Sequence, residues 1–256
     1  MCLLAVLSRV RPDAPLVVAA NRDELLARPT TPMAVLRADP RVLGGRDDLA
    51  GGTWLAVNHH GVVAGLTNRP NPSPDRTRRS RGELPLALAG HRDARSAVEA
   101  FRREVRPSDY NAAWLLVGDR HELWYVDLTG GDAPTATELP PGVHVLENRP
   151  LGADSPKAEH VGIAVAEASS ADDLPRRLRR VLADHAIPAR ARLAGDPFPP
   201  IETQATCVHA GPYGTRSAAI VVVPATPGPP SYAYTDGPPC ASAWHDATPM
   251  FHGRGG

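Results

Sequence analysis

The sequence is poor in cysteine and lysine, and it carries no formal net charge. The three cysteines, Cys2, Cys207 and Cys240, are an odd and sparse set, which excludes a disulfide framework and suits a reducing compartment. Lys157 is the only lysine, so the arginine content reflects a general preference and does not by itself indicate phosphate ligands. The 28 basic residues balance 28 acidic ones, and this balance gives no sign of a nucleic-acid partner.

Long apolar runs are also missing. No stretch approaches the roughly 18 apolar residues of a membrane-spanning helix. The apolar run at residues 2–7 is too short for the core of a signal peptide and has no basic flank before it. We therefore expect a cytoplasmic protein without a membrane span. The length of 256 residues, with no linker between two cores, predicts a single domain over residues 1–256.

The common cofactor and metal motifs are absent as well. The chain has no Cys-x-x-Cys, His-Glu-x-x-His, Gly-x-Gly-x-x-Gly, Walker or Gly-x-Ser-x-Gly sequence. His59 and His60 are adjacent in a predicted turn, and adjacent strand residues point to opposite faces. Cys207 and His209 share a strand face, which we interpret as a buried thiol beside a polar histidine. We therefore predict no cofactor and no metal site.

Apolar runs separated by short turns predict four hairpins and one further strand. The paired runs are 3–7 with 16–20, 53–57 with 62–67, 113–117 with 123–127, and 206–210 with 217–223; the further strand is 143–146. Strands joined by short turns form antiparallel sheets.

Three segments show the apolar spacing or composition of helices, and two are rich in proline. The helical segments are 93–105, 157–168 and 174–185, and the Pro-rich ones are 70–80 and 224–240. We expect the first Pro-rich segment to be a surface loop and the second to cover the sheet or to be partly mobile. Antiparallel sheets with helices grouped between hairpins predict a layered α+β fold.

Cys2 is the first candidate for chemistry. Removal of Met1 is expected because the second residue is small, and Cys2 would then carry both a thiol and a free α-amine. Such an amine has a reference pKa of about 7.7–8.0, low enough to act as a base near neutral pH. One residue would then supply the nucleophile and its base. The alternative is that Cys2 is an ordinary small apolar residue that begins a strand.

The first hairpin suggests a partner for Cys2. If the turn is centred between Pro12 and the next residue, Cys2 lies directly opposite Asp23. The polar run at 21–24 would then end beside the chain terminus, where a carboxylate could hold the α-amine. A slip by one residue would turn the side chains to the other face. A solvated strand end is the alternative interpretation of the polar run.

The chain resembles a known family at several points. Met1-Cys2 at the start and Asn21-Arg22-Asp23-Glu24 after the first hairpin resemble the NRDE family, whose eukaryotic members are called transport and Golgi organization proteins. Further segments that resemble the family are, in order, Gly51-Gly52-Thr53-Trp54-Leu55, Leu66-Thr67-Asn68, Arg81-Gly82-Glu83-Leu84, Tyr110-Asn111 and Tyr213-Gly214-Thr215-Arg216-Ser217. Each segment is weak alone, but the ordered set is specific.

The resemblance implies a four-layer αββα sandwich of two antiparallel sheets, the fold of N-terminal-nucleophile hydrolases. More distantly, the pattern is similar to penicillin V acylases and bile-salt hydrolases. By that similarity Cys2 is the catalytic nucleophile and Asp23 orients its amine. Asn68 and Asn148 are implied as polar groups near the thiol, and Arg216 as an electrostatic stabiliser of the site.

Two departures from the distant enzymes bear on these assignments. Those enzymes carry an arginine three residues before the aspartate, where this chain has Ala20. Arg22 adjoins the aspartate instead and is expected to point to the other face of the sheet. Glu147 precedes Asn148, and a carboxylate there would disfavour an oxyanion.

The function implied is hydrolysis of, or acyl transfer from, a small amide or acyl substrate by the Cys2 thiol, with Asn68 as an oxyanion donor. Eukaryotic members of the family are linked to secretory organisation and to haem or lipid handling. The alternative is therefore a non-catalytic protein that binds or traffics a lipid, acyl-CoA or haem on the same fold. Similarity of fold alone does not decide between the two functions.

Overall fold

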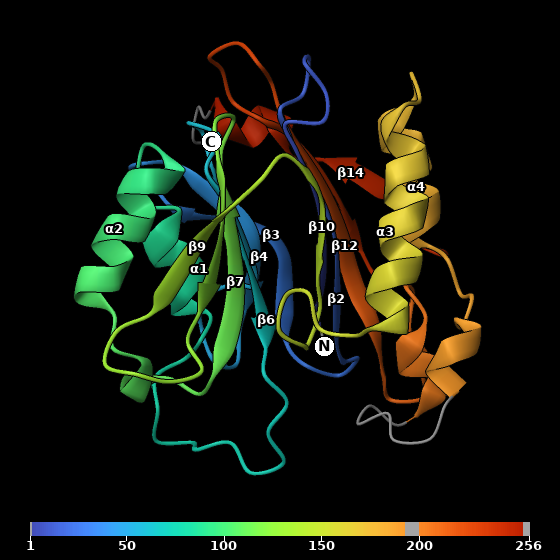
Figure 1. Cartoon of the computed structure of the whole chain (residues 1–256), viewed down its shortest axis with the longest axis horizontal. Helices are drawn as coiled ribbons and strands as arrows, with labels where there is room; N and C mark the ends of the chain where they lie inside the picture. The colour runs from blue at the N-terminus through green and yellow to red at the C-terminus, as the bar shows by residue number, and fades with distance from the viewer. Residues whose placement is uncertain (1, 193–199, 253–256) are drawn as a thin grey trace.

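The computed structural model describes residues 2–192 and 200–252, and two stacked antiparallel sheets form its centre (Figure 1). The first sheet runs, in spatial order, through β10 (Gly142–Leu146), β1 (Cys2–Ser8), β2 (Leu16–Leu25), β12 (Tyr213–Val223), β13 (Ser231–Asp236) and β14 (Trp244–Asp246), with β11 (His209–Ala210) paired to β12. The second runs through β3 (Thr30–Arg37), β4 (Val42–Asp47), β5 (Leu55–Asn58), β6 (Val63–Asn68), β7 (Ala113–Gly118), β8 (Leu123–Asp127) and β9 (Thr135–Leu139).

Helices cover the outer face of each sheet (Figure 1). The second sheet carries α1 (Glu83–Leu88) and α2 (Ala94–Glu104), and the first carries α3 (Pro156–Ser169) and α4 (Leu174–Leu182). Short 3-10 helices lie at Pro107–Asp109, Ala189–Arg192, Ile201–Gln204 and Thr248–Phe251. This layering confirms the expected αββα sandwich. Within the residues described, no helix is both long and apolar enough to cross a membrane.

Strand β1 shows how the layers arise from the sequence. Leu4 and Val6 belong to the apolar core between the sheets, whereas Leu3 and Ala5 pack with α3 and α4. Alternate strand residues point to opposite faces, so a strand buried on both faces is a continuous apolar run. Strand β1 accordingly lies in the interior of the first sheet, between β10 and β2.

Most of the predicted elements are present. The first three hairpins are β1 with β2, β5 with β6, and β7 with β8; the further strand is β10, and the helical segments are α2, α3 and α4. In the fourth hairpin, the first strand is only two residues long. The predicted elements did not include β3, β4, β9, β13, β14 or α1. Strand β13 lies inside the Pro-rich segment 224–240, with prolines at its flanks rather than in its middle.

The first hairpin is shifted by one residue from the predicted register. Cys2 pairs with Arg22 rather than with Asp23, so the predicted pairing is wrong. The connection spans residues 9–15, an odd number, and the hairpin is therefore centred on Pro12. The first residue of this connection, Arg9, adopts a left-handed backbone conformation with φ of 54°. Such a loop conformation is not visible in the alternation of apolar residues.

Candidate active site

Cys2 begins β1 at the edge of a pocket formed by both sheets. Its side chain shares a face with Leu4 and Val6, which lie in the core between the sheets, because alternate residues of a strand point the same way. The residue is half-buried and its thiol is not in a disulfide. It lines a pocket with a volume of about 650 Å³, to which Asn68 at the end of β6 also contributes.

Arg22 is the residue directly opposite Cys2, so their side chains lie on the same face. Only 4% of the Arg22 side chain is exposed, and its guanidinium stacks on Trp54 at 4.2 Å from the ring centroid. The nearest carboxylates, on Glu24 and Asp47, are 3.9 Å from Arg22 Nη2. The expectation that Arg22 points away from the thiol is therefore wrong, and a buried cation shares the face of Cys2.

Asn148 joins the start of β1 to the second sheet. The backbone nitrogen of Cys2 donates to Asn148 Oδ1 at 2.9 Å, and Asn148 Nδ2 donates to the main-chain carbonyl of Asn68. These two bonds orient the amide, with its acceptor toward Cys2 and its donor toward Asn68. The Oδ1 atom of Asn68 is buried and has no hydrogen-bond partner among the described residues. The structure thus brings Cys2, Asn68 and Asn148 together.

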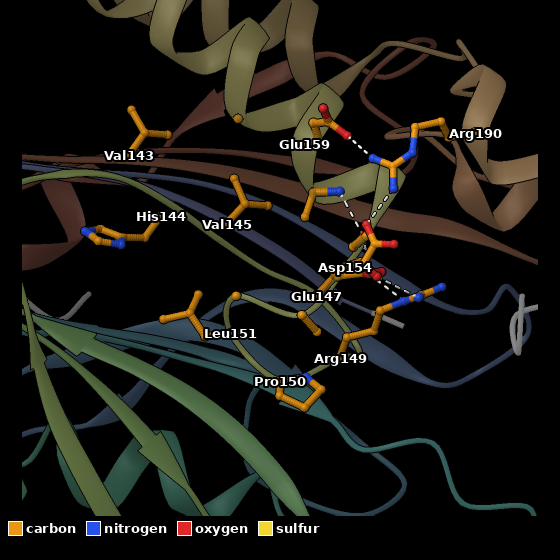
Figure 2. A pocket seen from close by; sticks show the side chains of 15 residues that line it. Val143, His144, Val145, Glu147, Arg149, Pro150, Leu151, Asp154, Glu159 and Arg190 are labelled. Atoms are coloured by element: carbon orange, nitrogen blue, oxygen red, sulfur yellow. Dashed lines mark hydrogen bonds and ion pairs between the residues drawn. The ribbon is translucent and has the colours of Figure 1, made fainter.

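Glu147 does not face this site. Its carboxylate accepts a hydrogen bond from Ser155 Oγ at 2.6 Å and lies 3.1 Å from Arg149 Nε. These groups line a separate hollow of about 530 Å³ beside β10 and α3, shown in Figure 2. Consecutive residues of an extended chain point to opposite sides. The carboxylate next to Asn148 in sequence is therefore held away from the thiol and cannot oppose an oxyanion there.

Asp23 lies on the helix-covered face of the sheet. Its Oδ1 accepts a hydrogen bond from Thr215 Oγ1 at 2.7 Å, and its Oδ2 is 3.6 Å from the ammonium group of Lys157 in α3. The Asp23 and Lys157 side chains are both almost fully buried. The side chains of Cys2 and Asp23 consequently lie on opposite faces, and the direct contact expected from the predicted register is absent.

Arg216 also lies outside the Cys2 pocket. A β-bulge interrupts the pairing of β12 with β2 at this residue, and Arg216 Nη1 lies 2.9 Å from Asp236 Oδ1 on the neighbouring strand. Of the residues to which the resemblance assigns a role, Cys2 and Asn68 thus line the pocket, whereas Asp23 and Arg216 do not.

Arginine side chains dominate the lining of the pocket. Six arginines contribute, against three carboxylates: Arg22, Arg28, Arg76, Arg78, Arg79 and Arg81, with Glu24, Asp47 and Asp75. Arg28 pairs with Asp47 at 2.7 Å. Within the described part of the chain, Arg81 has no ion pair, and its Nη1 donates to the carbonyl of Ala112 at 3.2 Å. Arg81 is therefore a half-buried cation available to an anion in the pocket.

Two glycine-containing segments hold Arg81 near Trp54. Gly52 has a positive φ of 77°, and a Cβ atom there would collide with the main chain of Gly82. The next residue, Thr53, donates its N–H to the Gly82 carbonyl at 2.9 Å. Close approach of two backbones requires glycine, so this contact places the residues that flank both segments on one wall of the pocket.

Burial and the charge of Arg22 shift the pKa of the Cys2 thiol in opposite directions. Burial raises the pKa of the Cys2 thiol, and the charge of Arg22 opposes this rise. Burial also lowers the pKa of Arg22 and of Arg81, and the negative charge of a Cys2 thiolate would raise both again. Arginine nevertheless remains protonated in proteins. The pocket therefore contains two poorly hydrated cations that favour a thiolate or another anion.

Three of these pocket residues had no predicted role at the thiol. Arg22 was assigned to the wrong face because the register was off by one residue. Trp54 packs against the core and also lines the pocket. Arg81 belongs to a segment with a family resemblance, but its place in the pocket depends on the approach of Gly82 to Gly52, which has no local signal.

The side chains that could hold a metal ion lie outside the Cys2 pocket. In residues 2–192 and 200–252, one group of three or more His, Cys, Asp or Glu side chains is placed to share an ion. It consists of His185, Cys207, His209 and Cys240, none of which lines the Cys2 pocket.

The chain is similar to a described protein family along most of its length. A family profile described as "Transport and Golgi organisation 2" matches residues 1–227. The "Transport and Golgi organization protein 2 homolog" of Bos taurus is 30% identical over 236 residues, which cover 82% of each chain. The Homo sapiens protein of the same name is 30% identical over 231 residues, also with 82% of each chain covered.

Two hydrolases are among the solved structures with a similar fold. A Caenorhabditis elegans N-acylethanolamine-hydrolyzing acid amidase ortholog matches with a TM-score of 0.54 and 14% identity, over 86% of this chain and 92% of that one. The C2A mutant of the conjugated bile acid hydrolase from Clostridium perfringens matches with a TM-score of 0.53 and 12% identity, over 96% and 92%. At these identities the similarity shows the fold, which is that of N-terminal-nucleophile hydrolases.

Proposed function

This chain belongs to the Transport and Golgi organisation 2 family, and we propose that it is an N-terminal cysteine hydrolase or acyltransferase that acts on a small amide or acyl compound. One observation carries the proposal. The backbone nitrogen of Cys2 is held by Asn148 Oδ1, while the Cys2 side chain lines a pocket. This arrangement positions both groups that an N-terminal nucleophile uses.

The first requirement is a base beside the thiol. Removal of Met1 converts the Cys2 nitrogen into an amine with a reference pKa of about 7.7–8.0. Asn148 Oδ1 accepts one N–H of that amine and so leaves the nitrogen lone pair available for the thiol proton. The side-chain amide of Asn148 is itself held by the Asn68 carbonyl. The base is therefore oriented by two residues that lie far from it in sequence.

The reaction then proceeds through a thioester. The Cys2 sulfur forms a bond to the substrate carbonyl carbon, and the carbonyl oxygen becomes an oxyanion. Asn68 and the cations Arg22 and Arg81 stabilise this charge; one amide donor in such a position contributes about 2.7–4 kcal/mol. The carbon–nitrogen bond breaks as the α-ammonium group returns a proton to the leaving amine. Water, or an acceptor amine, next attacks the thioester and releases the acyl group and the Cys2 thiol.

In this proposal Asp23 acts on the α-amine and not on the thiol. A backbone nitrogen lies in the plane of the sheet, so a carboxylate on either face can approach it. Asp23 directly follows the residue that pairs with Cys2 and is therefore level with the chain terminus after processing. Thr215 and Lys157 hold the carboxylate in place. Arg216, engaged with Asp236, is assigned no direct role.

The lining of the pocket favours an acyl compound that carries an anionic group. Arginines outnumber carboxylates in the lining, and Arg81 is half-buried without an ion pair in the described residues. A carboxylate or phosphate on the substrate would satisfy such a cation through two parallel hydrogen bonds. Burial strengthens this attraction because water screens it less.

The test is covalent trapping. The processed protein, with Cys2 first, is incubated with a panel of acyl and amide compounds, and intact mass followed by peptide mapping locates any adduct. We expect an acyl adduct on Cys2, none in Cys2→Ala, and an unchanged adduct in the control His121→Gln, at an exposed residue outside the pocket. Stoichiometric, reversible retention of a lipid or haem that Cys2→Ser leaves unchanged, with no adduct, would instead support the binding function.

A further inference from the structure

Two cysteines and two histidines meet at a point outside the proposed active site. Cys207 precedes β11 and His209 begins it, Cys240 lies in the turn after β13, and His185 follows α4. One side-chain ligand atom from each residue lies within 4.8 Å of the other three. Cys207 is buried and the other three are exposed, so the cluster sits at the surface with one ligand anchored in the interior.

The spacing of the ligand atoms fits a tetrahedron around a zinc ion. Cys207 Sγ and Cys240 Sγ are 3.7 Å apart, and His209 Nε2 is 3.3 Å from the Cys240 sulfur and 3.8 Å from the Cys207 sulfur. Zinc bonds of about 2.3 Å to sulfur and 2.0–2.1 Å to nitrogen, at tetrahedral angles, separate two sulfurs by about 3.8 Å and sulfur from nitrogen by about 3.6 Å. The three observed distances lie close to these values.

His185 completes the set from a fourth direction. Its Nδ1 lies 3.1 Å from the main-chain carbonyl of Cys207, and its ring centroid is 5.0 Å from that of His209. A neutral imidazole that donates from Nδ1 to a carbonyl carries its lone pair on Nε2. Metal-bound histidines are held in this way, with the second nitrogen donating to a carbonyl or carboxylate.

We propose that His185, Cys207, His209 and Cys240 bind one Zn²⁺ in a closed structural site. Two thiolates and two imidazoles are a ligand set of structural zinc. Since the protein supplies four ligands, no position remains for water or substrate, and the ion does not act in catalysis. This inference is independent of the proposed function, because none of the four residues lines the Cys2 pocket.

The sequence expectation of a thiol beside a histidine misses half of this site. Cys207 and His209 are neighbours on one strand, but His185 lies 22 residues before Cys207 and Cys240 lies 33 residues after it. Cys240 also lies beyond residues 1–227, which the family profile matches. The site therefore depends on the segment after β13, and the matched region alone does not supply all four ligands.

Zinc bound here would stabilise the helix-covered face of the first sheet, opposite the face that carries the Cys2 thiol. Val208, between two of the ligands, donates its N–H to Thr215 Oγ1 at 2.8 Å. The same hydroxyl donates to Asp23 Oδ1 at 2.7 Å. By joining β11, the β13 turn and the end of α4, the ion would limit movement of the strand that positions this hydroxyl.

The test is metal content. The full chain is expressed with added zinc, purified under reducing conditions without a chelator, and analysed by elemental mass spectrometry. We expect about one zinc per chain, and Co²⁺ substitution should produce the visible absorption bands of tetrahedral thiolate coordination. Cys240→Ser and His209→Gln should each lower zinc occupancy at least about fivefold. Cys2→Ser and His121→Gln, an exposed histidine outside the cluster, should leave it unchanged.

Three results would overturn the proposal. These are less than about 0.1 zinc per chain in the native protein, unchanged zinc in both ligand variants, or a Co²⁺ spectrum without thiolate character. Circular dichroism establishes whether each variant is folded. If a ligand variant unfolds, the spectrum of the native Co²⁺ protein still decides the question, because it reports the ligands directly.

Discussion

Cys2 and Arg22 face each other across β1 and β2, with the thiol and the guanidinium on the same side of the sheet. Arg22 is buried and stacked on Trp54, so its charge is held in a fixed position and is poorly screened by water. A cation in this position favours the thiolate form of Cys2. Arg22, in the polar run at residues 21–24, is therefore expected to make the Cys2 thiol more reactive.

Replacing Arg22 should make the Cys2 thiol less reactive. Arg22 lowers the pKa of this thiol against the opposing effect of burial, so Arg22→Met should raise that pKa further. Alkylation of Cys2 by iodoacetamide should become severalfold slower near neutral pH, and the rise of its rate with pH should move to higher pH. Peptide mapping over a pH series measures both changes. Arg103→Met, at an exposed arginine, is the control, and an unchanged profile in Arg22→Met would contradict the assignment.

Removing the Asn148 amide should affect both stability and turnover. Asn148→Ala leaves the Cys2 nitrogen and the Asn68 carbonyl without their partner, and an unsatisfied buried group costs about 1–3 kcal/mol in the free energy of unfolding. We expect a loss of this size in urea unfolding, with a larger proportional loss in kcat because the base is no longer oriented. The control is Asn71→Ala, at an exposed loop residue. Full turnover in Asn148→Ala would argue against a role for this amide.

The layered α+β class of this fold could be predicted because it follows from local patterns, whereas the four-layer αββα arrangement was implied by the family resemblance. The apolar run of β1 is continuous since both faces of the strand are buried, and helices α2 and α4 have buried residues at helical spacing. The register of the first hairpin could not be predicted, because it depends on the backbone of Arg9 and the connection that follows. A one-residue error exchanges the two faces, which is why Asp23 was assigned to the thiol and Arg22 was not.

From local patterns alone, the candidate site was predictable only where its residues stand at the ends of strands, and Asn148 was named only through the family resemblance. Cys2 and Asn68 stand at strand ends, and both line the pocket. The contact of Asn148 with Cys2 spans 146 residues of sequence, and the approach of Gly52 to Gly82 depends on backbone conformation. Such contacts leave no periodic trace in the sequence. They follow from how the two sheets stack, which local spacing does not specify.

The ion pair between Lys157 and Asp23 should be essential for stability. The two groups are 3.6 Å apart, with 3% and 0% of their side chains exposed. Removing one partner of a buried pair costs about 3–5 kcal/mol, because the remaining charge loses its counter-ion inside the protein. We expect Lys157→Met to lower the free energy of urea unfolding by about this amount.

Two further variants separate this effect from loss of a surface charge. Arg190→Met breaks exposed pairs with Asp154 and Glu159 and should cost less than about 1 kcal/mol. The double variant Lys157→Met with Asp23→Leu removes both buried charges and should be less destabilised than Lys157→Met alone. A cost for Lys157→Met no larger than that of Arg190→Met would show that the buried pair does not behave as its geometry indicates.

The strongest prediction concerns Met1. If Met1 is retained, the Cys2 nitrogen is an amide that cannot accept a proton near pH 7, and it can only donate to Asn148 as it does here. The residue would also occupy space at the edge of the pocket where an acyl group must approach the thiol. Loss of a general base lowers the rate roughly 100- to 10,000-fold. An N-terminal tag should therefore abolish turnover, whereas a C-terminal tag should have little effect.

The decisive comparison uses one protein in two forms, before and after a protease removes the tag to leave Cys2 as the first residue. Unfolding curves should be the same for both forms, because the change is confined to the terminus of β1. Turnover should appear only after cleavage, and adding the protease to a Cys2→Ala protein should produce none. A non-catalytic binder would retain its ligand in both forms unless the tag blocks the pocket. Equal turnover in both forms would eliminate the α-amine as the base, because the blocked nitrogen has no proton-accepting lone pair near neutral pH.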